Sequence, residues 1–166
     1  SKIIYETWGI LDKDIIKTAF DLTPKLKNIK KVVSHIADNN GLSCIITMSS
    51  DYYADLFFDY GFNHIFASRF PKNINEPFIA ENILVPNDKV KFTKELCKQY
   101  NLNYLDSIAF GDSMSDKYLF DELEHTICIN GDEQLRSIAK HVYDGDDLWD
   151  AYNIYISSYE CSTKIG

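Results

Sequence analysis

Short apolar runs alternate with amphipathic segments along most of the chain, and this alternation restricts the fold more than any other feature. The apolar runs are typical of buried strands, whereas the segments between them place apolar residues three and four positions apart, as one face of a helix does. Strands and helices that alternate in this way form a mostly parallel sheet with helices on both faces. We therefore predict a Rossmann-like, three-layer α/β/α fold.

The expected elements follow the chain in order. The predicted strands are residues 2–5, 43–48, 64–67, 107–110 and 126–129. One predicted helix begins at Thr23-Pro24 and ends at Asn39-Asn40-Gly41, and the others are 51–60, 89–100, 117–123 and 133–140. The less regular stretch 71–87 is predicted to form a surface hairpin.

The length of 166 residues suits one domain with a substantial core. No internal repeat, low-complexity tract or Gly/Ser linker divides the sequence. We predict a single domain over residues 1–150. The remaining residues, 151–166, form a tail whose role the sequence does not indicate.

Charge and cysteine content narrow the class of protein. The formal net charge of −8, without a basic face, argues against a nucleic-acid partner. No apolar stretch resembles a signal peptide or approaches a membrane span, so we expect no membrane partner. The four widely spaced cysteines form no metal motif, and a reducing compartment suits them. We expect a cytoplasmic protein, provided that residue 1 is close to the natural start.

Polar residues follow several predicted strands, where parallel α/β sheets place their working sites. Asp112 and Asp116 lie four residues apart in the loop after strand 107–110, and two neighbouring carboxylates need a counter-charge such as Mg²⁺. Ser49 and Ser50 follow strand 43–48, and the hydroxyl of Ser49 and adjacent N–H groups could hold phosphate oxygens. Lys89 could neutralise a further phosphate oxygen and pair with Asp116. Together these residues predict a cation site beside a phosphate site.

The order of these residues resembles the haloacid dehalogenase superfamily, most closely its phosphoserine-phosphatase-like branch. The resemblance covers residues 2–145. Ser49 matches the Ser or Thr of motif II, Lys89 matches the lysine of motif III, and Gly111-Asp112-Ser113-Met114-Ser115-Asp116 matches the G-D-x-x-x-D loop of motif IV. Lys91 is a rival for the motif III lysine. The resemblance implies Mg²⁺ bound by Asp112 and Asp116, and a phosphorylated ligand.

The chain departs from the family at motif I, D-x-D-G-T-L, where the first Asp attacks phosphorus and binds the metal, and the second is the acid and base. Alignment of strand 2–5 places Glu6 at the nucleophile position and Trp8 at the acid/base position. Glu6 could still bind a cation, but its extra methylene displaces the carboxylate by ~1 Å, which can cost on the order of a hundredfold. Trp8 has no proton to exchange at neutral pH, which forfeits about 10²–10⁴-fold.

Another register remains open. If Trp8-Gly9-Ile10-Leu11 is the strand end, Asp12-Lys13-Asp14 becomes the D-x-D and both carboxylates return. This register lacks the small turn residue after the second Asp and leaves the run at residues 3–5 without a role. A third possibility is a fragment that lacks a motif I upstream, which would split the sheet.

Only a short stretch separates Gly9 from Thr23, too short for the helical cap domain that the family's phosphoserine phosphatases carry there. Without a folded cap the site would be open, which suits a macromolecular substrate or protein partner, and a second copy in an oligomer could act as the lid.

Three functional hypotheses follow. The first is a phosphatase-like protein with little or no activity that serves in binding or regulation. The second is an active Mg²⁺-dependent phosphomonoester hydrolase that uses Asp12 and Asp14. The third is a structural interaction module that binds no metal.

Overall fold

The computed structural model describes residues 12–73 and 75–163, with side chains as far as residue 158. Its described residues form two compact units: 12–25 with 33–73 and 75–85, called here the first unit, and 26–32 with 86–163, the second unit. Helix α3 (Ile29–Asp38) contributes residues to both. The other elements of the first unit are α2 (Lys13–Leu22), β1 (Cys44–Ser50), α4 (Asp51–Ala54), the 3₁₀ turn η1 (Asp55–Tyr60), β2 (His64–Ser68) and the 3₁₀ turn η2 (Ala80–Asn82).

In the first unit β1 and β2 pair in parallel, from Cys44 beside His64 to Ser50 beside Ser68. Asp12 caps the start of α2, whose Ile16 and Phe20 are buried. The ring of Phe20 makes edge contacts with Tyr53, Phe57 and Tyr60. The aromatic residues that follow β1 therefore form the surface on which α2 packs.

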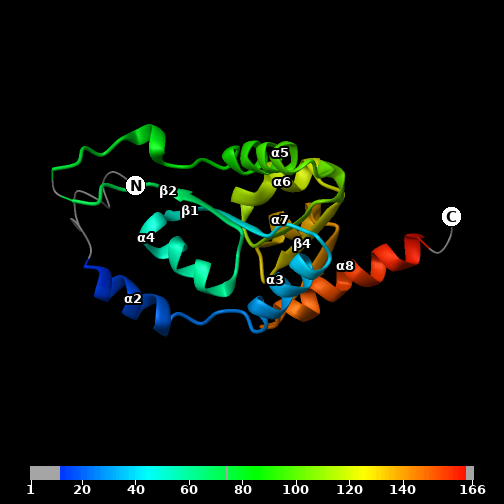
Figure 1. Cartoon of the computed structure of the whole chain (residues 1–166). Coiled ribbons are helices and arrows are strands. Elements are labelled where there is room, and N and C mark those ends of the chain that lie inside the picture. The colour runs from blue at the N-terminus through cyan, green and yellow to red at the C-terminus, as the bar shows by residue number, and fades with distance from the viewer. Residues whose placement is uncertain (1–11, 74, 164–166) are drawn as a thin grey trace. The chain divides into compact units, whose positions relative to one another are not determined.

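The second unit is built on a parallel sheet in the order β3 (Ile108–Gly111), β4 (His125–Ile129) and β5 (His141–Tyr143). Its helices are α5 (Asp88–Tyr100), α6 (Lys117–Glu122), α7 (Glu133–Ile138) and α8 (Leu148–Thr163), with the 3₁₀ turns η3 (Tyr104–Asp106) and η4 (Met114–Asp116). Helices α5 and α6 lie side by side (Figure 1).

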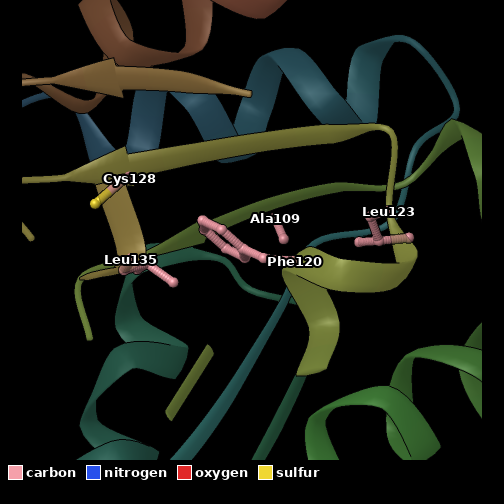
Figure 2. Packing of buried hydrophobic residues seen from close by; sticks show 5 residues of the cluster. All are labelled: Ala109, Phe120, Leu123, Cys128 and Leu135. Atoms are coloured by element: carbon pink, nitrogen blue, oxygen red, sulfur yellow. The ribbon is translucent and has the colours of Figure 1, made fainter. Parts of the chain in front are cut away.

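Alternate residues of these strands face two separate hydrophobic clusters, as the two-residue period of a strand requires. On one face Ala109 and Cys128 pack with Phe120, Leu123 and Leu135 of the α6–α7 region. Figure 2 shows the ring of Phe120 directed from α6 towards Leu135. On the other face Ile127 and Ile129 pack with Ala151 of α8. Helices thus cover both faces of this sheet.

The predicted boundary at residue 150 falls inside α8. Ala151 and Tyr152 are buried, and Ile154 and Tyr155 pack against the cluster around Ile127. The first part of the predicted tail is therefore packed on the sheet. The extent of the single domain remains a prediction.

The α/β class and the parallel pairing of the strands are confirmed, as are the predicted strands other than residues 2–5, which lie outside the described residues. In the described part of the segment before α3, residues 12–28, the one helix is α2, so no cap domain is folded there. Within residues 12–73 and 75–163 no helix has both the length and the apolar character needed to cross a membrane.

Three predicted elements differ from the structure in their bounds or their type. The helix expected from Thr23 begins at Ile29, because Lys27 forms a bridge to Asp147 and Asn28 has a φ of 60°. The expected hairpin is replaced, in the described residues 71–73 and 75–87, by bends and the turn η2. The helix expected over 133–140 ends at Ile138, and β5 follows it.

Candidate functional site

A buried ion pair joins the start of α5 to the loop after β3. Lys89 and Asp116 are both less than a tenth exposed, and Lys89 Nζ lies 2.5 Å from Asp116 Oδ1. Lys89 Nζ also donates a hydrogen bond to Ser115 Oγ at 3.1 Å. A buried charge needs a close counter-charge and further hydrogen bonds, and Lys89 has both. The predicted pairing of Lys89 with Asp116 is confirmed.

Lys91, the rival lysine, occupies a different face of α5. It is exposed, and its Nζ lies 5.5 Å from the ring centroid of Phe92. Residues two apart on a helix point to different sides. Only one of the two lysines can therefore face the loop after β3, and it is Lys89.

The second oxygen of Asp116 holds the loop itself. Asp116 Oδ2 accepts hydrogen bonds from the N–H groups of Asp112, at 3.2 Å, and Ser113, at 3.4 Å. Ser113 and Asp116 form a reciprocal capping box, in which each side chain accepts from the other residue's backbone N–H. Asp116 is thus fixed by the loop on one oxygen and by Lys89 on the other.

Gly111 is required by the position of Asp116. A Cβ atom at residue 111 would lie 2.5 Å from Asp116 Cγ and 2.6 Å from its Oδ2, closer than non-bonded atoms come. Since Asp116 is held at both oxygens, it has little freedom to move away. The glycine of the G-D-x-x-x-D loop therefore serves the close approach of this carboxylate to the strand end.

We expect Gly111→Ala to lower the free energy of unfolding by about 1–3 kcal/mol, the usual cost of forcing extra atoms into a packed site. Urea unfolding followed by circular dichroism measures the change. Ser137→Ala on the exposed side of α7 is the control and should change stability by less than about 0.5 kcal/mol. An alanine at residue 111 that costs no more than the control would show that Asp116 can move aside.

The loop after β4 supports the loop after β3. The Asp112 carbonyl oxygen accepts a hydrogen bond from the N–H of Asp132 at 3.1 Å. A Cβ at Gly131 would lie 2.6 Å from that same carbonyl oxygen and 2.4 Å from Cys128 Sγ. Burial raises the pKa of the Cys128 thiol, which is therefore protonated at neutral pH and is a poor nucleophile or metal ligand.

The side chain of Asp112 differs in its environment from that of Asp116. It is exposed at the end of β3, whereas both oxygens of Asp116 accept hydrogen bonds within the protein. The described residues contain no group of three or more His, Cys, Asp or Glu side chains that could hold a metal ion. Of the two carboxylates of this loop that were predicted to bind a cation, Asp112 is the exposed one.

In the first unit, Ser49 and Ser50 have different surroundings. Ser50 Oγ accepts the N–H of Tyr52 at 3.1 Å and so caps α4. Ser49 is exposed, and its N–H donates to Thr47 Oγ1 at 3.1 Å. Its hydroxyl makes no hydrogen bond to any residue that the structure describes. Ser50 therefore has a structural role, and the hydroxyl of Ser49 is available to a ligand. The predicted binding of phosphate by these two serines remains a prediction.

Of the two registers proposed for motif I, only the one that uses Asp12 and Asp14 falls within the described residues. Glu6 and Trp8 lie outside the described residues. Asp12 caps α2, where its Oδ1 accepts the N–H of Asp14 at 2.7 Å, and both residues are exposed. A carboxylate at a helix N-terminus has an ordinary structural explanation. The capping role accounts for Asp12 without catalysis.

Two serines of the loop after β3, Ser113 and Ser115, were not among the predicted site residues. Ser115 donates to or accepts from Ser113 Oγ at 3.0 Å and contacts Lys89 Nζ. The Ser-x-x-Asp spacing from Ser113 to Asp116 is a capping-box pattern and could have identified Ser113. No sequence pattern indicates Ser115, because its contact is with a residue 26 positions away.

Residues 61–150 match the model of the haloacid dehalogenase-like hydrolases, and this span contains Lys89, Asp112 and Asp116. The chain belongs to this family. The match covers more than half of the chain and confirms the resemblance seen in its motifs. No curated protein matches the chain significantly.

Solved structures agree at the level of the fold. A probable phosphoserine phosphatase from Vibrio cholerae has a TM-score of 0.71 at 12% identity, over 79% of this chain and 42% of that one. A phosphoserine phosphatase with a phospho-aspartyl intermediate analogue has a TM-score of 0.73 at 15% identity, over 87% and 71%. A substrate-bound phosphoserine phosphatase has a TM-score of 0.74 at 15% identity, over 87% and 70%. The chain thus has the fold of the phosphoserine-phosphatase-like branch, and spans less than half of the first of these proteins.

Proposed function

We propose that this haloacid dehalogenase-like protein binds a phosphorylated ligand together with Mg²⁺ but hydrolyses it slowly or not at all. The observation that carries the proposal is the buried Lys89–Asp116 pair, which Ser115 and the loop N–H groups complete, beside the exposed Asp112. An arrangement that buries two charges costs desolvation energy. Its retention at the end of β3 supports a binding role for this loop.

Lys89 supplies the positive charge for the phosphate group. An ammonium has three N–H donors, and two of them reach Asp116 and Ser115. No described residue accepts the third. In the proposed function this N–H donates to a phosphate oxygen, and Ser49 remains a predicted phosphate ligand from its place in motif II.

The exposed carboxylate of Asp112 fits a hard cation, because Mg²⁺ prefers a few carboxylate oxygens and keeps several of its waters. Asp112 would hold the ion, which would supply positive charge to draw the phosphate group towards this acidic loop. Glu6 remains a predicted metal ligand from its place in motif I. Asp116 was predicted as a metal ligand. Since both its oxygens are engaged, we propose that it positions Lys89 and the loop instead.

The residues at motif I are the reason to expect slow hydrolysis. Glu6 and Trp8 replace the two catalytic aspartates of the family, and the register that restores them uses Asp12, which caps α2. A protein with this motif would bind the ligand through its other motifs and lack the nucleophile and the acid. Such a protein would act through binding or regulation.

Titration calorimetry with Mg²⁺ and inorganic phosphate tests the proposal. We expect the parent to bind Mg²⁺, with phosphate binding dependent on it, and Asp112→Asn to weaken Mg²⁺ binding at least tenfold, because an amide lacks the charge a hard cation requires. Asp106→Asn, an exposed acidic residue in the same unit, is the control and should leave binding unchanged.

Two outcomes would contradict the proposal. A parent that binds neither Mg²⁺ nor phosphate would indicate an interaction module without metal. Rapid hydrolysis of para-nitrophenyl phosphate that Asp12→Asn abolishes would indicate an active phosphatase with Asp12 and Asp14 in its active site.

A further inference from the structure

A pocket of about 260 Å³ lies in the first unit directly after β2. Its polar wall is formed by Arg69, Glu76 and Asn82, and apolar side chains that include Phe70, Pro77 and Ile79 form the rest. Pockets that bind small molecules combine apolar walls with a few polar groups in this way. None of these residues belongs to the site proposed for phosphate and Mg²⁺.

Hydrogen bonds hold the walls of this pocket in place. The N–H of Arg69 donates to the Asn82 carbonyl oxygen at 2.9 Å, and the N–H of Phe70 donates to Asp51 Oδ1 at 3.3 Å. Ser68, which pairs with Ser50 across the sheet, accepts the N–H of Leu84 at 3.0 Å through its hydroxyl. The pocket is therefore anchored to the carboxyl end of β2.

The side chain of Arg69, unlike its backbone N–H, has no partner among the residues that the structure describes. Its guanidinium makes no hydrogen bond or ion pair with any described residue, whereas Arg136, the chain's other arginine, pairs with Asp144. A guanidinium presents five N–H donors in a planar fork that matches a carboxylate or a phosphate. Arg69 is exposed on the wall of this pocket, so its donors are open to an anionic ligand in a chain whose net charge is −8.

Glu76 decides which anion fits. Its Oε2 accepts the N–H of Lys72 at 2.7 Å and its Oε1 accepts Asn73 Nδ2 at 2.5 Å, and these bonds hold the carboxylate on the pocket wall. A negative charge in the same pocket repels an anion in proportion to the anion's charge. A carboxylate, with one charge, is therefore better suited than a phosphate dianion.

We propose that this pocket, called here the Arg69 pocket, binds the carboxylate of a small organic acid. The guanidinium of Arg69 takes the carboxylate, and the apolar part of the acid packs on Phe70, Pro77 and Ile79. The volume is just below the roughly 300 Å³ at which drug-sized pockets begin, so the acid is small. This inference goes beyond the proposed function and does not depend on it.

Titration of the full chain with phenylacetate, followed by backbone amide chemical shifts, tests the proposal. We expect saturable shifts at Arg69, Phe70, Ile79 and Asn82, and none with phenylacetamide, which has the same shape without the charge. Arg69→Gln should weaken phenylacetate binding at least tenfold, because it removes charge-assisted hydrogen bonds. Arg69→Lys, which keeps the charge and loses the planar fork, should fall between parent and Arg69→Gln.

Lys13→Gln, at an exposed lysine of α2 outside the pocket wall, is the matched control and should bind as the parent does. No saturable binding, equal binding of phenylacetamide, or unchanged binding by Arg69→Gln would overturn the proposal. Inorganic phosphate that produces the same shifts at the same affinity would overturn the preference for a carboxylate. Mg²⁺ and phosphate binding at Asp112 is measured separately, so failure of one proposal leaves the other standing.

Discussion

The double substitution Glu6→Asp/Trp8→Asp is expected to raise hydrolysis of para-nitrophenyl phosphate with Mg²⁺ at least ~10⁴-fold over the parent. Shortening Glu6 withdraws its carboxylate by about 1 Å to the position of the family's nucleophile, which accounts for ~10²-fold. An aspartate at residue 8 restores the general acid and base, which accounts for ~10²-fold or more. Steady-state release of para-nitrophenol measures the change.

The two single variants are the first controls. A third control adds Asp12→Asn to the double variant and tests the register of motif I that uses Asp12. Each single substitution should recover only part of the rate, because the nucleophile and the acid act in the same reaction. Asp12→Asn placed in the double variant should leave the gain intact, since Asp12 caps α2. A double variant that folds and binds Mg²⁺ but hydrolyses no faster than the parent would show that motif I does not begin at Glu6.

The elements that sequence predicted well are those whose pattern is local. Residues 127–129 form an apolar run, and the corresponding strand β4 contains the fully buried Ile127 and Cys128. Such a run can be satisfied only by burial on both faces. The end of the turn η1 at Gly61 could also be predicted from the neighbouring residues, because glycine readily adopts the positive φ, here 94°, that ends such a turn.

The errors arise where distant residues determine the backbone. Helix α3 begins late because the Lys27 N–H donates to the Asp146 carbonyl oxygen and Asn28 Nδ2 donates to Asp147 Oδ2, partners more than a hundred residues away. The strand β5 has three residues, and its Val142 is 41% exposed, so it lacks the apolar run of a buried strand. Neither feature is visible in a window of neighbouring residues.

In the candidate site, too, some features could be predicted from the sequence and others depend on contacts that only the structure shows. Lys89 and Asp116 were predicted as a pair because a lysine can neutralise a phosphate oxygen and pair with a neighbouring carboxylate, and the order of the family's motifs agreed with this. The division of work between the two aspartates was not predicted. Sequence gives Asp112 and Asp116 equal standing, whereas the hydrogen bonds from Lys89 and the loop N–H groups distinguish the buried carboxylate from the exposed one.

Removing the lysine of this pair should have the largest effect on stability. We expect Lys89→Met to lower the free energy of unfolding by about 3–5 kcal/mol, the usual cost of leaving a buried charge without its partner. Methionine keeps the length of the stem, so the loss reports on the charge and its hydrogen bonds rather than on a cavity. Asp116 would remain less than a tenth exposed in the parent geometry, with no cation beside it. Urea unfolding measures the change.

A second substitution separates the effect of the buried charge from the effect of the hydrogen bonds that hold the loop. In Lys89→Met/Asp116→Asn the amide oxygen can still accept the N–H groups of Asp112 and Ser113, but no buried charge remains, so the double variant should be more stable than Lys89→Met alone. Lys91→Met, two residues along α5 and exposed, is the matched control and should change stability by less than about 0.5 kcal/mol. If Lys89→Met costs no more than Lys91→Met, the ion pair contributes nothing to the fold, and its retention at the end of β3 would have to be explained by ligand binding alone.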